Sequence, residues 1–112
     1  MARLDSQTLV SALIRRVEGV GGFAAVLHKG DPIGGIILVQ LLDHGRFGTL
    51  LERMTDLEGR QTMVRIGPRS DAQETEISDY IFRRRRSDPD LWVVELDIAE
   101  GERFAAEALC NG

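Results

Sequence analysis

The stretch that decides the fold is DAQETEISDYIFRRRRSDPDLWVVEL, residues 71–96. It begins with acidic side chains, continues into a run of four arginines and then reaches Pro89. Ile77, Tyr80 and Ile81 recur at helical spacing and form one narrow apolar face. Negative charge near the start and positive charge near the end complement the helix dipole. These features predict a helix that ends before Pro89.

Local signals at both ends of this helix support the prediction. Ser70 and Gln73 have the spacing of a capping box, in which two side chains bond the free N–H groups of the first turn. Pro89 disfavours helical geometry in the residue before it, which ends the helix. Residues 91–96 are apolar apart from Glu95, and this pattern predicts a strand in the interior of a sheet.

The chain before this stretch begins with a second helical pattern. We expect Ser6 to cap this helix and Gly19 to end it. Its apolar side chains recur on one helical face: Leu9, Val10, Leu13, Ile14 and Val17.

Strand patterns separated by Gly, Pro and Asp turn signals follow the first helix. They cover residues 23–28, 36–42, 47–54 and 61–66. The second is apolar on both faces, which favours a central place in the sheet, and the fourth is more polar, which favours an edge. After residue 96 the spacing of apolar side chains predicts a short helix that starts near Gly101.

The predicted element order is therefore α-β-β-β-β-α-β-α. This order indicates an α+β fold with a mainly antiparallel sheet of about five strands, an N-terminal helix, a helix before the last strand and a short C-terminal helix. A length of 112 residues predicts a single domain over residues 1–112. The order of the strands in the sheet is left open.

Composition narrows the compartment and the partners. The net charge of −4 argues against general affinity for nucleic acid, which requires many positive groups on phosphates. Cys110 is the only cysteine, so no internal disulfide forms and a reducing compartment is expected. The N-terminus has no signal-peptide pattern and the longest apolar run is far too short to span a bilayer. We therefore expect a cytoplasmic protein that does not enter a membrane.

The arginine-rich helix end and the turn after it contain the candidate residues for binding a ligand or partner: Arg84, Arg85, Arg86, Asp88, Asp90 and Trp92. Four consecutive arginines spread over about 300° of a helix, so only two or three of them can face one ligand. The simpler interpretation is a solvated helix end that satisfies the dipole. Asp88 and Asp90 fit turn chemistry better than a catalytic pair, and Trp92 fits a core position better than a stacking surface.

Motifs of known catalytic and metal sites are missing from the sequence. His28 and His44 have no Cys or His at metal-ligand spacing. The chain has no nucleophile elbow, Walker A sequence or H-E-x-x-H helix, and Cys110 lies two residues from the C-terminus. We therefore predict no catalytic residue, no cofactor site and no metal site, and an enzyme is the less favoured class.

Five segments carry a resemblance to one family: SALIRR at 11–16, GFA at 22–24, KGD at 29–31, GGI at 34–36 and, most specifically, RRSDPDLWVVE at 85–95. Together they resemble the domain-of-unknown-function family 1491, small proteins of alphaproteobacteria. The resemblance implies a bacterial cytoplasmic protein that stands alone as one domain. It carries over no activity, cofactor or catalytic residue.

Two hypotheses for function follow. The first is a non-enzymatic binding or protein-interaction module, with a homodimer as one form. Its basis is that strands 36–42 and 91–96 are apolar on both faces, whereas we expect the short helices to cover only one face of the sheet. The alternative is an anion or nucleic-acid binder that uses arginines 83–86, with Trp92 as a stacking partner.

Overall fold

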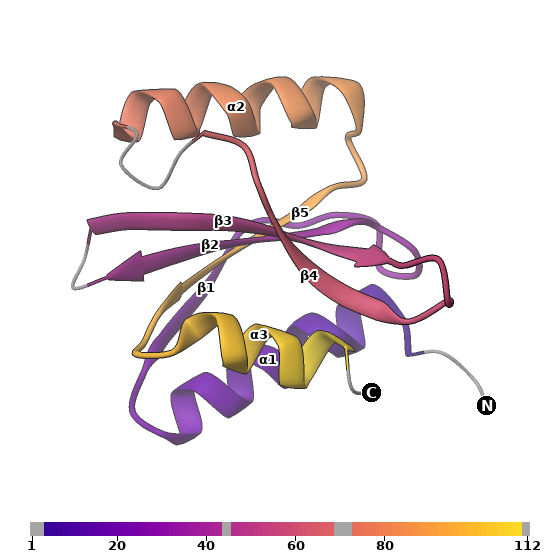
Figure 1. Ribbon diagram of the computed structural model, residues 1–112, viewed down its shortest axis with the longest axis vertical. Coiled ribbons are helices and arrows are strands. Elements are labelled where there is room, and N and C mark those ends of the chain that lie inside the picture. Colours follow the sequence, from indigo (N-terminus) through magenta and orange to yellow (C-terminus); the bar gives the residue numbers. More distant parts are fainter. Residues whose placement is uncertain (1–3, 44–45, 69–72, 111–112) are drawn as a thin grey trace.

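The computed structural model describes residues 4–43, 46–68 and 73–110 (Figure 1). The fold class is α+β, and the order of helices and strands is the one predicted from the sequence. The elements are α1 (Ser6–Gly19), β1 (Phe23–His28), β2 (Ile37–Asp43), β3 (Arg46–Thr55), β4 (Gln61–Ile66), α2 (Glu74–Ser87), β5 (Trp92–Asp97) and α3 (Gly101–Cys110).

The strands form one mixed sheet in the order β1-β5-β2-β3-β4. The pairs β1·β5, β2·β3 and β3·β4 are antiparallel, so the sheet is mainly antiparallel, as expected. The pair β2·β5 is parallel, because the chain crosses over the sheet through α2 before β5 inserts between β1 and β2. The strand that the sequence predicted as interior is therefore flanked on both sides, and β4 lies at an edge.

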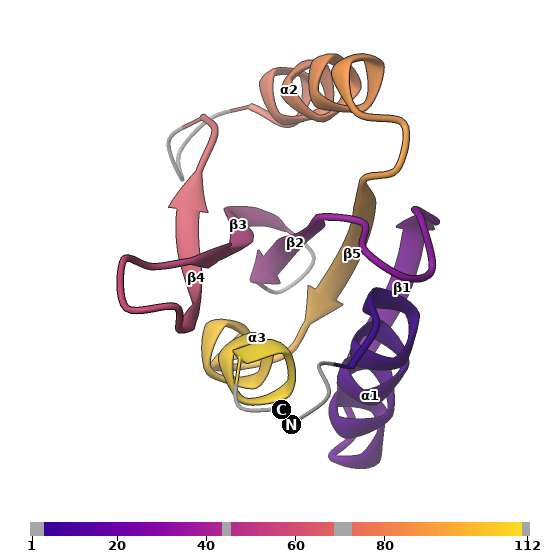
Figure 2. The same cartoon turned by 90° about the vertical axis from the view of Figure 1, so that its right-hand side faces the viewer.

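Helices α1 and α3 cover one face of the sheet (Figure 2). Alternate residues of the central strands point toward this face, as the two-residue period of a strand requires. Together with apolar side chains of both helices they form the larger core cluster: Leu9, Val10, Leu13, Val17, Ile37, Val39, Leu51, Trp92, Val94, Leu96, Ala105, Ala108 and Leu109.

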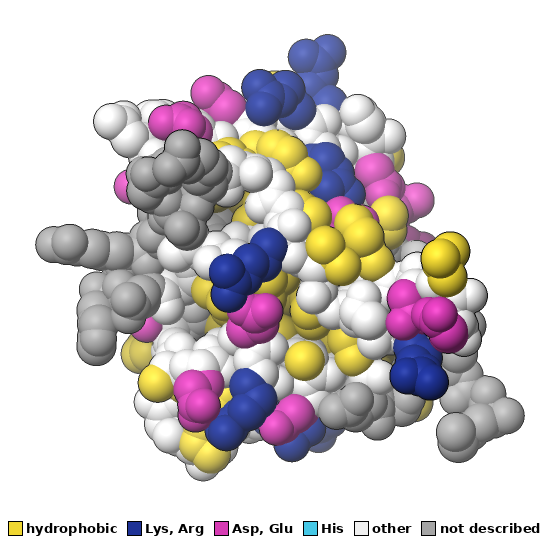
Figure 3. Space-filling model, viewed as in Figure 1, with side chains coloured by type: hydrophobic (Ala, Val, Ile, Leu, Met, Phe, Trp, Pro, Cys, Tyr) yellow, Lys and Arg dark blue, Asp and Glu magenta, His cyan; other side chains and the backbone are white. Residues whose placement is uncertain are grey.

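Helix α2 lies over the opposite face, where a smaller cluster forms: Leu38, Leu50, Ile77, Ile81, Leu91 and Val93. The expectation that helices cover only one face is therefore wrong, because α2 crosses the face that α1 and α3 leave open. The cover is incomplete. Hydrophobic side chains reach the surface below α2 on the side of β4 (Figure 3), and Met54 and Val64 are 36% and 37% exposed.

The start of α1 differs by one residue from the prediction. Asp5, not Ser6, is the cap, and its carboxylate accepts a hydrogen bond from the N–H of Thr8 at 2.8 Å. Ser6 is the first helical residue, and its buried hydroxyl donates to the carbonyl of Gly35 at 2.7 Å. Both residue types favour the cap position, so the tertiary contact to Gly35 decides between them.

Helix α1 ends at Gly19, but the left-handed glycine that terminates it is Gly21, two residues beyond the glycine expected in that role. Gly21 adopts the left-handed conformation with φ of 87°. Its N–H donates to the carbonyl of Glu18, and the N–H of Gly22 donates to the carbonyl of Val17 at 2.9 Å. These two bonds are the Schellman arrangement, in which Gly21 holds the position that other residues adopt only with strain. Gly19 remains helical.

Helix α2 begins later in the sequence than predicted. The helix begins at Glu74 with Gln73 as its cap, and the carboxylate of Glu76 accepts a hydrogen bond from the N–H of Gln73 at 3.5 Å. Ser70, which the sequence suggested as the cap, lies outside the described residues.

The loop between β1 and β2 packs against the turn between α2 and β5. The N–H of Asp31 donates to the carbonyl of Asp90 at 3.0 Å, and the indole N–H of Trp92 donates to the carbonyl of Asp31 at 2.8 Å. Gly30 and Gly35 approach the Asp90 carbonyl so closely that a Cβ at either position would collide with it. Three segments of the family resemblance, 29–31, 34–36 and 85–95, are therefore joined in one packed unit.

Candidate ligand-binding pocket

The arginines at the end of α2 lie in different surroundings. The guanidinium of Arg84 donates to the carboxylate of Glu52 at 2.8 Å and to the hydroxyl of Tyr80 at 3.1 Å. Partial burial lowers the pKa of Arg84, but its bonds to Glu52 and Tyr80 outweigh burial and raise the pKa above the usual value. Arg84 thus joins α2 to β3, whereas Arg83 and Arg86 are exposed.

Asp88, Asp90 and Trp92 have structural contacts. The carboxylate of Asp88, the residue after α2, accepts a hydrogen bond from the N–H of Asp90 at 3.1 Å. Asp90 contributes its carbonyl to the packed loop through Asp31. Trp92 is 2% exposed and belongs to the core on the α1 and α3 face. Of the six candidate residues, only Arg85 lines the pocket between α2 and the sheet.

A pocket of about 320 Å³ lies between α2 and the sheet, on the side of β1 and β5. We call it the α2 pocket. In Figure 2 these two strands run on one side of the space beneath α2, and β4 runs on the other. The pocket is lined by Leu27 and His28 from β1, Gln40 from β2, Ser78, Ile81, Phe82 and Arg85 from α2, and Val93 and Glu95 from β5.

The position of α2 follows from its sequence pattern. Ile77 and Ile81 are buried and fix the helix on the sheet. Ser78, Phe82 and Arg85 follow one another at four and three residues, which places them on one side of the helix above β1 and β5. Helix α2 therefore presents an apolar ring and a guanidinium to the pocket.

Gln40 is the central polar residue of this pocket. It is 3% exposed, and its side chain forms no hydrogen bond to the part of the chain that the structure describes. It is the register partner of Glu95 on β5, and both side chains line the pocket. No buried side-chain nitrogen or oxygen of the described residues lacks a hydrogen-bond partner, so the Gln40 amide reaches the open space of the pocket. A ligand group that donates and accepts can bond to it there.

Two groups of opposite charge lie on different walls of the pocket. Arg85 is on α2 and Glu95 is on β5, and within the described ranges neither one forms an ion pair. His28 lies beside them, where burial and the nearby positive charge of Arg85 lower its pKa below 6.5. Both effects disfavour the protonated imidazole, so Arg85 and Glu95 supply the main charges of the lining.

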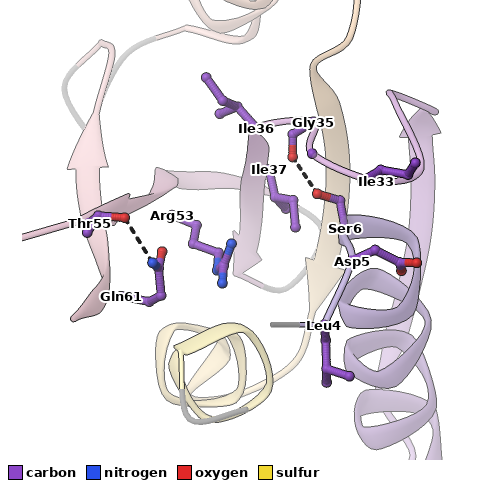
Figure 4. A pocket seen from close by; sticks show the side chains of 11 residues that line it. Leu4, Asp5, Ser6, Ile33, Gly35, Ile36, Ile37, Arg53, Thr55 and Gln61 are labelled. Carbon is purple, nitrogen blue, oxygen red and sulfur yellow. Dashed lines mark hydrogen bonds between the residues drawn. The ribbon is translucent and has the colours of Figure 1, made fainter. Parts of the chain in front are cut away.

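A second pocket, of about 390 Å³, lies on the other face beside the start of α1 (Figure 4). Its polar groups already bond within the protein. Ser6 donates to the carbonyl of Gly35, Gln61 donates to the Thr55 hydroxyl at 2.8 Å, and Arg53 donates to the Leu109 carbonyl at 2.7 Å. This pocket therefore has fewer polar groups available to a ligand than the α2 pocket.

The described ranges are residues 4–43, 46–68 and 73–110. Over these ranges no group of three or more His, Cys, Asp or Glu side chains is arranged to hold a metal ion. Within the same ranges, none of the helices has the length and apolar character needed to cross a membrane. Burial raises the pKa of the Cys110 thiol, which disfavours the nucleophilic thiolate. His44 lies outside the described residues.

The fold and the pocket define a class: a small α+β protein whose mixed five-stranded sheet is covered by helices on both faces. Residues 4–106 match the family described as protein of unknown function, DUF1491. The chain belongs to this family, which confirms the resemblance found in the sequence.

Solved structures of alphaproteobacterial proteins share the fold. A crystal structure of a DUF1491 family protein from Caulobacter crescentus is 34% identical, with a TM-score of 0.80 over 91% of this chain and 94% of that chain. A solution structure of a protein from A. tumefaciens is 35% identical, with a TM-score of 0.72 over 88% of this chain and 89% of that chain. No curated protein matches the chain.

One residue of the sequence, Gln40, signals the pocket, although it is not among the six candidates. Gln40 is the only polar residue in the otherwise apolar segment 36–42. A polar side chain inside a strand buried on both faces requires a partner or a cavity. His28, Phe82 and Glu95 had no comparable signal, because their approach to Gln40 depends on the strand order.

Proposed function

We propose that this protein is a non-enzymatic binding module and that the α2 pocket is its binding site. The main support is Gln40, a polar side chain that forms no hydrogen bond to the described residues and lines a pocket with apolar walls. Small-molecule sites in proteins combine such walls with a few polar groups and have volumes of about 300–1,000 Å³. The 320 Å³ of the α2 pocket lie at the lower end of this range.

The contacts of the candidate acid and base residues in the described chain support binding over catalysis. Arg84 is held by Glu52 and Tyr80, and the Asp88 carboxylate bonds within its own turn. Neither group is available as an acid, a base or a nucleophile in the α2 pocket. The imidazole of His28 is the remaining titratable group there besides Arg85 and Glu95.

The test is a titration of ¹⁵N-labelled protein with two small probes, indole and benzamide, followed by amide chemical shifts. We expect shifts that saturate and that concentrate at the residues lining the α2 pocket. Phe82→Ala should weaken binding, because Phe82 lines the pocket and is 59% exposed. Phe23→Ala is the matched control, since Phe23 is 78% exposed and does not line it. Equal binding by both variants would refute the assignment of the site.

The second candidate function is an anion or nucleic-acid binder at the arginine-rich end of α2. It is supported by the exposure of Arg83, Arg85 and Arg86 at the C-terminal half of one helix. Such binding should weaken steeply as salt is raised, because each phosphate contact releases counterions. A fluorescence-anisotropy titration with a short single-stranded oligonucleotide at 50 and 200 mM salt tests it. Affinity that does not change with salt would exclude it.

A homodimer is the form of protein interaction that the surface supports. Phe23, Val26 and Leu27 are exposed on β1, which is an edge strand of the sheet. Edge strands with exposed apolar side chains pair readily with another chain. Sedimentation velocity of the protein and of Val26→Lys tests this form. A single monomeric species at all concentrations would exclude it.

The binding module is proposed to act as one domain in the bacterial cytoplasm. The lone, partly buried Cys110 suits a reducing compartment. The two core clusters share the same sheet, which supports a single folding unit over residues 1–112. Cell fractionation with a tagged chromosomal copy tests the location, and one cooperative unfolding transition tests the domain assignment.

A further inference from the structure

The charges of the α2 pocket restrict the class of ligand that it can accept. We infer that the α2 pocket, if it is the binding site proposed above, takes a zwitterion with an apolar body, of the class of a free α-amino acid with an apolar side chain. The juxtaposition behind this inference is one cation on α2, one anion on β5 and a buried amide on β2 around apolar walls.

Arg85 and Glu95 supply the two charges. They line the same pocket from opposite elements, and neither forms an ion pair in the described part of the chain. A carboxylate bound by Arg85 and an ammonium bound by Glu95 would each gain a charge-assisted hydrogen bond. A ligand with only one of these charges would gain only one of the two bonds.

The charged and titratable groups beside Arg85 and Glu95 add no further net charge to the pocket. Arg84, the neighbour of Arg85, is committed to Glu52 on β3. His28 on β1 faces the pocket, and burial and Arg85 lower its pKa, which disfavours the protonated imidazole. The pocket is therefore electrically balanced, which suits a ligand with a net charge of zero.

Gln40 adds hydrogen-bonding capacity between the two charges. Its amide carries donors and an acceptor, and Glu95 lies beside it in register on β5. An ammonium group has three donors, so it can bond to Glu95 and to the amide oxygen of Gln40 together.

The apolar walls select the body of the ligand. Leu27, Ile81, Phe82 and Val93 line the pocket, and Ile81 and Val93 are buried in the core cluster of this face. A branched or aromatic side chain would pack against them, whereas a polar one would lose hydration. A nucleotide fits less well, because its phosphates would face Glu95 while only Arg85 among the lining residues is positive.

The test uses L-phenylalanine and two analogues that each lack one charge, 2-phenylethylamine and 3-phenylpropionate. The three share the aromatic body, so differences in affinity report the charged groups. Chemical-shift titrations at pH 7.5 should show L-phenylalanine binding at the pocket residues, and each analogue binding about tenfold or more weakly. Equal affinity of all three at the pocket would overturn the inference.

Variants assign each charge to its residue. Arg85→Gln should remove the preference for L-phenylalanine over 2-phenylethylamine, and Glu95→Gln should remove the preference over 3-phenylpropionate. Arg86→Gln is the control, because Arg86 is exposed and does not line the pocket. A control variant that loses the same preference would also overturn the inference.

The two proposals fail in different ways. If indole and benzamide shift the pocket residues but L-phenylalanine binds no better than its analogues, the zwitterion is wrong and the binding site stands. If none of the five probes shifts the pocket residues, both the zwitterion and the site are wrong. Shifts from L-phenylalanine at residues outside the pocket would likewise refute the inference.

Discussion

The packed unit of the β1–β2 loop and the α2–β5 turn makes a sharp prediction for Gly35. A Cβ at this position would collide with the carbonyl oxygen of Asp90 and would lie 2.9 Å from Cδ1 of Trp92 and 3.0 Å from the nitrogen of Asp31. Two of these three contacts are with backbone atoms, which cannot rotate away. Gly35→Ala therefore forces the loop off the turn.

The size of the effect follows from what the movement breaks. Overpacking a tight site costs about 1–3 kcal/mol. Displacing the loop also weakens the bond from the Asp31 N–H to the Asp90 carbonyl and the bond from the Trp92 indole to the Asp31 carbonyl. Each is worth about 1 kcal/mol. We expect Gly35→Ala to lower the free energy of unfolding by about 3 kcal/mol, a large part of the roughly 5–15 kcal/mol of a typical protein.

The assay is urea unfolding followed by tryptophan fluorescence. Trp92 is the only tryptophan and lies in this unit, so its emission reports the unit directly. Gly34→Ala is the matched control, because a Cβ at Gly34 would meet nothing within 4 Å. We expect this control to change stability by less than about 0.5 kcal/mol. Equal stability of the two variants would refute the close packing at Gly35.

Three further predictions concern other contacts. Glu52→Gln should lower the free energy of unfolding by about 1–3 kcal/mol, because it leaves Arg84 without its carboxylate partner. A double-mutant cycle with Arg84→Met should show a coupling free energy above about 0.5 kcal/mol. The pKa of His28 is lower in the folded than in the unfolded protein, so the unfolded state binds the proton first as pH falls below about 6.5. Stability should therefore decrease from pH 7 to pH 5, and His28→Gln should reduce that decrease in urea midpoints; an unchanged slope would contradict it. Gly21→Ala should destabilise by about 1 kcal/mol through its φ of 87°, whereas Gly19→Ala, inside α1, should be neutral or stabilising by thermal unfolding.

Local patterns predicted the elements, but contacts distant in sequence decided their arrangement. Strands β1 and β4 have the predicted bounds, because alternation and turn residues are properties of a few neighbouring positions. The insertion of β5 beside β2 in parallel had no local signal, since the pairing forms only after α2 crosses the sheet. The cover of both faces followed from this crossing, so the sequence argument for an uncovered apolar face was wrong.

The candidate site was predicted less completely than the fold. Arg85 was among the six residues proposed from the sequence, and it lines the α2 pocket. Arg84 and Trp92 were proposed with it, but their contacts with Glu52 and Asp31 are structural. Gln40 was visible as a polar interruption of an apolar strand. Its role in the pocket depends on the space that α2 leaves above the sheet, and no pattern within β2 specifies that space.

The place of β5 in the sheet also affects how the chain can be assembled. Strand β1 lies at the edge, and its neighbour in the sheet is β5, the last of the five strands along the chain. On the ribosome, β1 is made first of the strands and cannot join the sheet until β5 has emerged. The hairpins of β2, β3 and β4 can form meanwhile, because their contacts are local. Completion of the sheet, and with it of the α2 pocket, is thus delayed until β5 has emerged.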